Sequence, residues 1–144
     1  MSSEIILGGL QACERPLGYD VQNTWGGWSG TYTAFFVNLF NHTITIKNPN
    51  GAYALGQTSF TSYCSGISNV QGMVETNSQI VHGVSWGKMY YAYASYHERF
   101  TYVWYSDFLT PGTHSFQAGI FVSSGSSITF DSNDGGTSSL WEVP

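Results

Sequence analysis

Charged residues are nearly absent from a long central stretch of this sequence. Between Val21 and Val74 the only Asp, Glu, Lys or Arg is Lys47, and residues 76–87 contain none. The solvent side of an amphipathic helix normally carries charged residues, so these segments do not read as surface helices. The whole chain has 9% charged residues, whereas an ordinary soluble domain has roughly 25%. The sequence therefore favours strands over helices.

Apolar residues recur with a period of two, as they do in strands. Phe100, Tyr102 and Trp104 share one face of residues 98–106, for example. We predict strands at 31–40, 42–47, 57–63, 79–85, 88–96, 98–106, 113–122, 126–131 and 138–143. Turn-forming residues separate several of them, such as the run from Asn48 to Gly51. About eight to ten short strands with such turns predict an all-β fold, an antiparallel β-sandwich or a barrel.

The chain divides into a short N-terminal arm and one β domain. Pro16 and several glycines, with little alternation, predict an arm or loop over residues 1–30, followed by a sandwich over 31–144. The first residues lack a basic segment and carry Glu4, so they do not resemble a signal peptide. Cys13 and Cys64 form either one disulfide or two buried thiols.

Composition excludes several classes of function. Four Lys and Arg against nine Asp and Glu, with a pI near 5.0, provide no basic patch for nucleic-acid phosphates. No apolar stretch approaches the ~18 residues that a membrane-spanning helix needs. The aromatic content of 17% and apolar content of 42% are opposite to those of a disordered chain.

The sequence contains none of the common catalytic motifs. Its four histidines, which are His42, His82, His97 and His114, show no metal-ligand spacing. The run from Asp131 to Gly136 resembles a calcium loop in its oxygen side chains, but Gly135 occupies the fifth position, so a glycine-rich hairpin turn is the better interpretation. We therefore expect no enzyme activity, no cofactor and no metal.

Aromatic side chains instead indicate an interface. Residues 88–96 and 98–106 carry apolar or aromatic residues on both faces, whereas a monomeric sandwich leaves one face of each sheet in water. Either another subunit covers the outer face, most simply in a homo-oligomer, or the tyrosine hydroxyls reach solvent there. The Trp25–Trp28 segment either anchors the arm in a groove or stacks on sugar rings. The candidate interface residues are Trp25, Trp28, Tyr91, Tyr93, Tyr102, Trp104 and Trp141.

The C-terminal third carries a family resemblance. Three segments contribute to it: Phe108–Phe116 (FLTPGTHSF), Ser123–Ser127 (SSGSS) and Gly135–Val143 (GGTSSLWEV). Together, within residues 98–143, they resemble the closing portion of phage virion jelly-roll domains, which are similar to C1q/TNF-type heads. The resemblance implies a trimeric jelly roll displayed on a virion and assembled in the host cytoplasm. It transfers no catalytic residues.

Three functions follow as hypotheses. The first is a non-enzymatic homotrimer that decorates and cements a phage capsid, where it binds the major capsid protein or another virion protein. The second is a receptor- or glycan-binding module at the tip of a head or tail fibre, which recognises a host surface glycan. The third is a membrane-active β-sandwich of the aegerolysin type, which the chain is similar to in size, acidity and Trp/Tyr richness.

Overall fold

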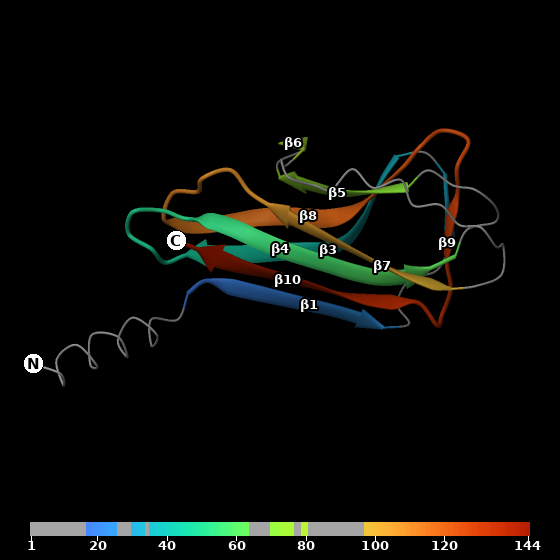
Figure 1. Ribbon diagram of the computed structural model, residues 1–144, viewed down its shortest axis with the longest axis horizontal. Coiled ribbons are helices and arrows are strands. Elements are labelled where there is room, and N and C mark those ends of the chain that lie inside the picture. The colour runs from blue at the N-terminus through green and yellow to red at the C-terminus, as the bar shows by residue number, and fades with distance from the viewer. Residues whose placement is uncertain (1–16, 26–29, 34, 64–69, 77–78, 81–96) are drawn as a thin grey trace, which may run out of the picture.

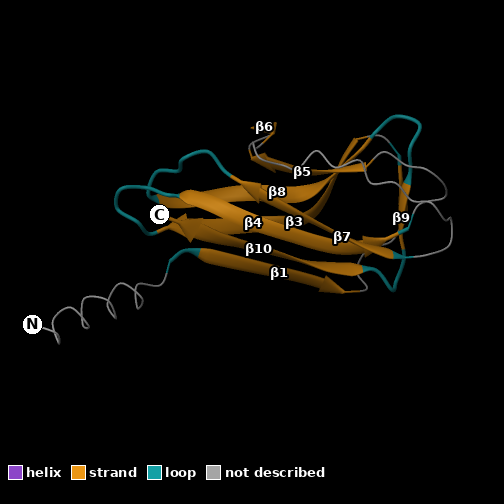
Figure 2. Cartoon of the chain, viewed as in Figure 1, coloured by secondary structure: helices purple, strands orange, loops and turns teal. Residues whose placement is uncertain are grey.

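The computed structural model describes residues 17–25, 30–33, 35–63, 70–76, 79–80 and 97–144 (Figure 1). Within these ranges the regular structure consists of strands alone, as the colouring of Figure 2 shows. The strands are β1 (Tyr19–Trp25), β2 (Gly30–Tyr32), β3 (Phe35–Ile46), β4 (Tyr53–Ser62), β5 (Val70–Thr76), β6 (Gln79–Ile80), β7 (Glu98–Tyr105), β8 (Gly112–Val122), β9 (Ile128–Phe130) and β10 (Gly135–Val143). The described part of the chain contains no helix of the length and apolarity that crossing a bilayer would require.

Two four-stranded antiparallel sheets pack face to face (Figure 1). One has the strand order β1-β10-β4-β7 and the other has the order β3-β8-β5-β6, while β2 and β9 pair as a separate ribbon. Consecutive strands repeatedly change sheets, and the last strand, β10, lies between β1 and β4. This strand order is that of a jelly-roll β-sandwich, so the predicted fold class is confirmed.

Alternation along each strand explains the packing. In β3 the side chains of Phe40, His42, Ile44 and Ile46 point into the sandwich, and Asn41, Thr43 and Thr45 between them are exposed. In β7 the inner residues are Tyr102 and Trp104, and Trp104 is fully buried. The buried apolar residues of both sheets form one cluster: Phe40, Ile44, Ile46, Ala52, Ala54, Phe60, Tyr102, Trp104, Phe116, Ala118, Ile120, Val122, Ile128, Phe130 and Leu140.

Several predicted boundaries need correction. The predicted arm over 1–30 contains β1, which pairs with β10 along its whole length, so the sandwich begins before residue 31. The predicted strands 31–40 and 42–47 are divided differently, because β3 runs continuously from 35 to 46 through a bulge between Asn38 and Phe40. Strand β5 was not predicted. Residues 81–96, with the predicted strand 88–96, lie outside the described residues, as do Cys13 and Cys64.

The predicted turn after β3 is confirmed. The Gly51 N–H donates to the Asn48 carbonyl at 3.0 Å, and the Asn50 N–H donates to the Asn48 side-chain oxygen at 3.0 Å. Gly51 has φ of 85°, and a Cβ there would lie 2.5 Å from the Leu109 carbonyl oxygen. Glycine is therefore required both by the backbone conformation and by the close approach of the β7–β8 connection.

Candidate functional site

A buried polar network crosses the sandwich between the two sheets. His42 on β3 lies 2.9 Å through Nδ1 from Asp20 Oδ2 on β1, and 2.6 Å through Nε2 from Ser138 Oγ on β10. Ser138 Oγ lies 2.7 Å from Thr58 Oγ1, which accepts a hydrogen bond from Trp104 Nε1 at 3.3 Å. With His42 neutral, its Nδ1–H donates to Asp20. Each hydroxyl and ring nitrogen of the buried polar network then has a hydrogen-bond partner.

The order Ser138, His42, Asp20 is that of a hydrolase triad, but the site is closed. Ser138 is 0% exposed and His42 is 1% exposed, and β10 is flanked by strands on both sides. A nucleophile must reach a substrate carbonyl, and a hydroxyl sealed between two sheets does not. The arrangement satisfies buried polar groups and joins β1, β3, β4 and β10.

Charge in this network is controlled by burial and hydrogen bonding. Burial lowers the pKa of His42 below its usual value, although the bond to Asp20 opposes the shift. Burial alone would raise the pKa of Asp20, but hydrogen bonds from Gln22, His42 and the Thr43 amide outweigh it and lower the pKa. The network therefore contains a carboxylate and a neutral imidazole at neutral pH.

Glu142 plays a similar structural role at the end of β10. Its carboxylate accepts hydrogen bonds from the backbone amides of Gly18 at 2.8 Å, Lys47 at 3.0 Å and Asn48 at 2.7 Å. Burial would raise the pKa of Glu142, but these amides outweigh burial and lower it. The side chain thereby ties the entry to β1 and the end of β3 to the last strand.

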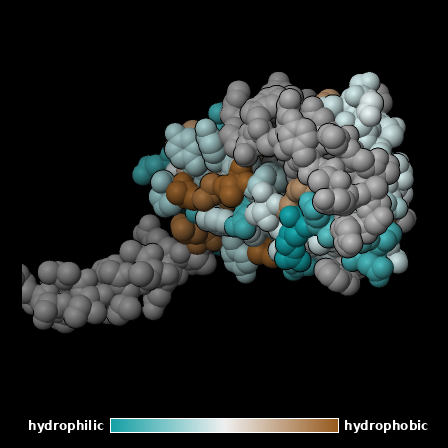
Figure 3. Space-filling view, turned by 45° about the vertical axis from the view of Figure 1, so that its right-hand side comes forward, coloured by the Kyte–Doolittle hydropathy of each residue, from teal (hydrophilic) through white to brown (hydrophobic). Residues whose placement is uncertain are grey.

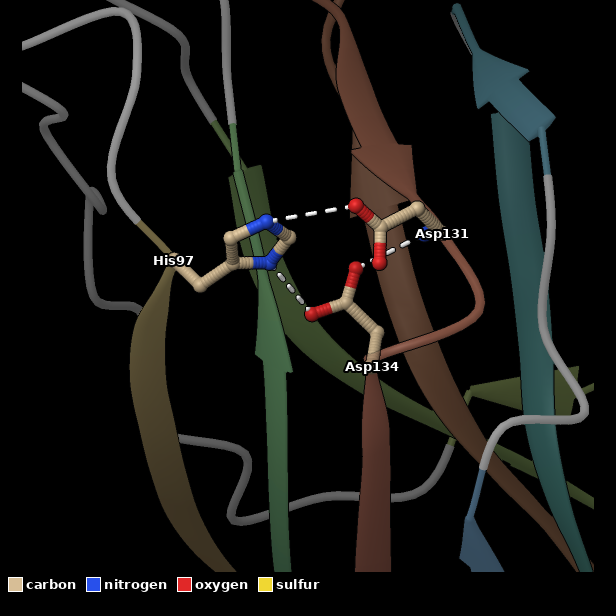
Figure 4. Close-up of side chains that lie close together, drawn as sticks. All are labelled: His97, Asp131 and Asp134. Atoms are coloured by element: carbon tan, nitrogen blue, oxygen red, sulfur yellow. Dashed lines mark hydrogen bonds and ion pairs between the residues drawn. The ribbon is translucent and has the colours of Figure 1, made fainter.

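A second cluster of chemically versatile side chains lies at the start of β7 (Figure 4). His97 Nδ1 is 2.8 Å from Asp134 Oδ1, and His97 Nε2 is 3.3 Å from Asp131 Oδ2. Both aspartates belong to the turn between β9 and β10, and Asp134 Oδ2 accepts the Asp131 amide at 2.8 Å. One nitrogen or oxygen atom from each of the three side chains lies within 4.8 Å of the other two, so the side chains offer ligands suited to a metal ion.

The outer face of the β1-β10-β4-β7 sheet carries a row of large apolar side chains. Pairing across the four strands aligns Tyr19 with Trp141, Trp141 with Leu55, and Leu55 with Tyr105. We call these four residues the aromatic row. Tyr19 is 72% exposed and Tyr105 is 51% exposed, while Leu55 and Trp141 are half-buried.

Further apolar residues extend the aromatic row. Val21 and Val103 lie on the same outer face in the adjacent row, and each is about half exposed. Tyr53 and Phe108 are also about half exposed, and their ring centroids are 5.4 Å apart. Figure 3 shows hydrophobic side chains exposed together on the surface of the described part. Exposed apolar side chains grouped on one face are typical of an interaction surface.

The outer face of the other sheet differs in chemistry. Along residues 41–45 of β3 and 113–117 of β8, the outward-pointing residues are polar and uncharged. They are Asn41, Thr43, Thr45, Thr113, Ser115 and Gln117. This part of the β3–β8 face therefore suits water, and the half-buried pair Phe36 and Phe121 lies further along it. The outer face of the β1-β10-β4-β7 sheet exposes valine and tyrosine beside polar residues such as Gln57 and Thr101.

The structure separates the candidate interface residues. Tyr102 and Trp104 lie in the core, at 7% and 0% exposure, so the prediction that they contact a partner is wrong for these two. Trp141 lies in the aromatic row. The Trp25 side chain, together with Trp28, Tyr91 and Tyr93, lies outside what the structure describes.

Sequence reasoning missed several surface residues. The alternation of 98–106 places Val103 and Tyr105 together on one face, and the bulkier face of Phe100, Tyr102 and Trp104 is the buried one. Choosing the less bulky face as the outer one would have found Val103 and Tyr105. Tyr19 and Val21 were missed because residues 19–25 were assigned to the arm.

Comparison with known proteins finds similarity to solved structures only. No family model matches the sequence, and no curated protein matches it. A chain of infectious bursal disease virus strain Gx aligns with a TM-score of 0.49 and 9% identity over 85% of this chain. Eiger TNF from S. frugiperda aligns with a TM-score of 0.36 and 10% identity over 88% of this chain and 94% of its own.

A subviral particle of VP2 from infectious bursal disease virus aligns with a TM-score of 0.32 and 10% identity over 91% of this chain. This chain spans 32% of the Gx-strain chain and 42% of the VP2 chain. At these scores the alignments add nothing to the strand order, which defines the chain as a jelly-roll β-sandwich.

Proposed function

We propose that this chain is a non-enzymatic structural subunit of a virion, which assembles as a homotrimer and decorates a phage capsid. The observation that carries the proposal is the aromatic row with its apolar neighbours on the outer face of the β1-β10-β4-β7 sheet. Association buries this face, and the polar outer face of β3 and β8 remains in water.

The exposed apolar area is large enough for the centre of an interface. Six residues on and beside this face are about half exposed or more: Tyr19, Val21, Tyr53, Val103, Tyr105 and Phe108. At roughly 100 Å² each they supply on the order of 600 Å², close to the ~800 Å² per partner of a standard interface. Tyr and Trp are also the residues that most often dominate binding energy.

The virion assignment is supported by the motif resemblance of residues 98–143. This region includes β7 and β10, which carry Tyr105 and Trp141 of the aromatic row. The shortage of charge fits the same proposal, because a subunit covered by partners needs fewer charges to remain in solution. In the proposed role the chain assembles in the host cytoplasm and binds the major capsid protein or another virion protein.

The first test is the mass of the protein in solution. Sedimentation velocity or light scattering is expected to give three times the chain mass of 15.8 kDa. Val103→Lys places a charge on the apolar face and is expected to yield monomers, while the matched control Thr45→Lys on the polar face leaves the assembly unchanged. Thermal melts by circular dichroism serve as the control that both variants fold. A monomeric wild-type chain, or a trimer unaffected by Val103→Lys, would overturn the assembly proposal.

Binding to particles is the second test. Capsids that lack the protein are mixed with purified chain, and co-sedimentation with a stoichiometry in multiples of three is expected. An assembled trimer that does not bind capsids would reject the decoration role while leaving the assembly role intact.

The exposed tyrosines favour receptor or glycan binding as the second candidate. Tyr19 and Tyr105 are at least half exposed, and sugar rings can stack on exposed tyrosine rings. Binding on a glycan array that disappears in Tyr105→Ala would favour a fibre-tip module over a decoration protein. Binding to lipid vesicles would instead favour the membrane-active alternative.

A further inference from the structure

We propose that His97 and Asp131 bind a divalent transition-metal ion, with Asp134 as the residue that positions the imidazole. His97 Nε2 and Asp131 Oδ2 are the ligand atoms, and solvent completes the coordination. The site joins the start of β7 to the turn between β9 and β10, which are 34 residues apart in the sequence (131 minus 97). This proposal is independent of the assembly surface.

Asp134 determines which ring nitrogen is free. Its carboxylate is fully buried and lies 2.8 Å from His97 Nδ1, so the Nδ1–H donates to Asp134 (Figure 4). A carboxylate that accepts the remaining N–H of a histidine ligand is the usual outer partner in metal sites, where it fixes the tautomer and raises ligand basicity. Nε2 is then the ring nitrogen that a metal ion would use.

Asp131 Oδ2 lies 3.3 Å from Nε2, so the carboxylate and this ring nitrogen face each other across a short gap. Either an Nε2–H donated to the carboxylate or a metal ion bound by both atoms fits this arrangement. In a tetrahedral zinc site with bonds of 2.0–2.1 Å, two ligand atoms are about 3.3 Å apart. The separation therefore suits two ligands of one metal ion.

Charge and access favour a cation as well. The two aspartates carry two negative charges, and the ion pairs found among the described residues all involve histidine, not lysine or arginine. The side chains of His97 and Asp131 are 37% and 41% exposed, so an ion can enter from solvent. A nitrogen and an oxygen ligand together favour Zn²⁺ or Mn²⁺ over Ca²⁺, which takes oxygen ligands.

The test uses the full chain after dialysis against a chelator, with Zn²⁺ as the probe. Calorimetric titration near pH 7 is expected to show one Zn²⁺ per chain, and saturating Zn²⁺ is expected to raise the melting temperature by a few degrees. Asp131→Asn, at an exposed ligand, is expected to weaken binding at least tenfold. Asp107→Asn is the matched control because Asp107 is exposed and outside the cluster, and it should bind as the wild type does.

His97→Gln separates this site from other histidines, since it is expected to abolish Zn²⁺ binding. The nitrogen chemical shifts of His97 supply a readout that does not depend on stability: the metal form should show Nδ1 protonated and Nε2 bound. Absence of binding at millimolar Zn²⁺, or binding that persists in both Asp131→Asn and His97→Gln, would overturn the proposal. So would an imidazolium with both nitrogens protonated that does not respond to Zn²⁺.

Discussion

Gly56 on β4 provides the space into which the Trp104 indole packs. The two residues are directly opposite each other on β4 and β7, and both face the core. A Cβ at position 56 would lie 2.1 Å from Cε2, 2.4 Å from Cζ2 and 2.5 Å from Nε1 of Trp104. Real Cβ atoms do not approach other atoms this closely, so Gly56→Ala must move the indole.

The cost follows from what the indole would lose. Overpacking a filled core typically costs ~1–3 kcal/mol. Displacing Nε1 from Thr58 Oγ1, now at 3.3 Å, removes a buried hydrogen bond worth about 1 kcal/mol. Alanine restricts the unfolded chain, which offsets ~0.4–1 kcal/mol. Gly56→Ala is therefore expected to lower the free energy of unfolding by about 2–3 kcal/mol.

Urea unfolding followed by circular dichroism measures this change. Trp104→Phe removes the indole atoms that the new Cβ would meet, so a double-mutant cycle is decisive. The double variant Gly56→Ala/Trp104→Phe is expected to be at least 1 kcal/mol more stable than the sum of the two single effects predicts. Gln57→Ala, on the exposed side of the same strand, should change stability little. Additive effects in the cycle, or a neutral Gly56→Ala, would refute the packing argument.

Three further predictions concern the buried network, the β10 carboxylate and the β3–β4 turn. The pKa values of His42, Asp20 and Glu142 are all lowered in the folded protein, so the unfolded chain binds more protons. Stability in urea should therefore fall as the pH drops below 6.5 and fall further below 4.5. His42→Gln should flatten the curve of stability against pH between pH 6.5 and 5. Glu142→Gln removes the charged acceptor of three amides and should cost about 2–4 kcal/mol by urea unfolding, with a smaller loss of stability below pH 4.5 than in the wild type. Gly51→Ala should cost more in melting temperature than Gly125→Ala, because both have positive φ but only Gly51 has neighbours within 4 Å; equal losses would contradict a role for the Leu109 contact.

The fold could be predicted from the local sequence pattern where one face of a strand is apolar and the other is polar. Residues 112–122 alternate clearly, so this strand and its buried face follow from sequence. Residues 98–105 also predict a strand, but both of its faces are apolar or aromatic, so the sequence does not say which face is buried. Strand β1 was missed because its inward side carries Asp20 and Gln22, which are polar and therefore look like loop residues. Their burial is explained by His42 and the Thr43 amide, which are reached only after folding.

The candidate sites could be predicted less well, because they depend on long-range pairing. Val103 and Tyr105 become part of one surface with Tyr19 only through the strand order β1-β10-β4-β7. His97 meets Asp131 and Asp134 because the start of β7 lies beside the β9–β10 turn (Figure 4). No spacing along the chain encodes either juxtaposition.

The shortage of charge has a consequence for how this fold is held together. The Asp20 and Glu142 carboxylates are stabilised by hydrogen bonds from amide N–H groups and, for Asp20, from His42. Hydrogen bonds inside the protein are screened little by salt, whereas surface ion pairs weaken as salt rises. Stability of the sandwich should therefore depend on pH far more than on ionic strength. The same reasoning applies to the aromatic row, since apolar contact with a partner subunit is strengthened, not screened, by salts such as sulfate.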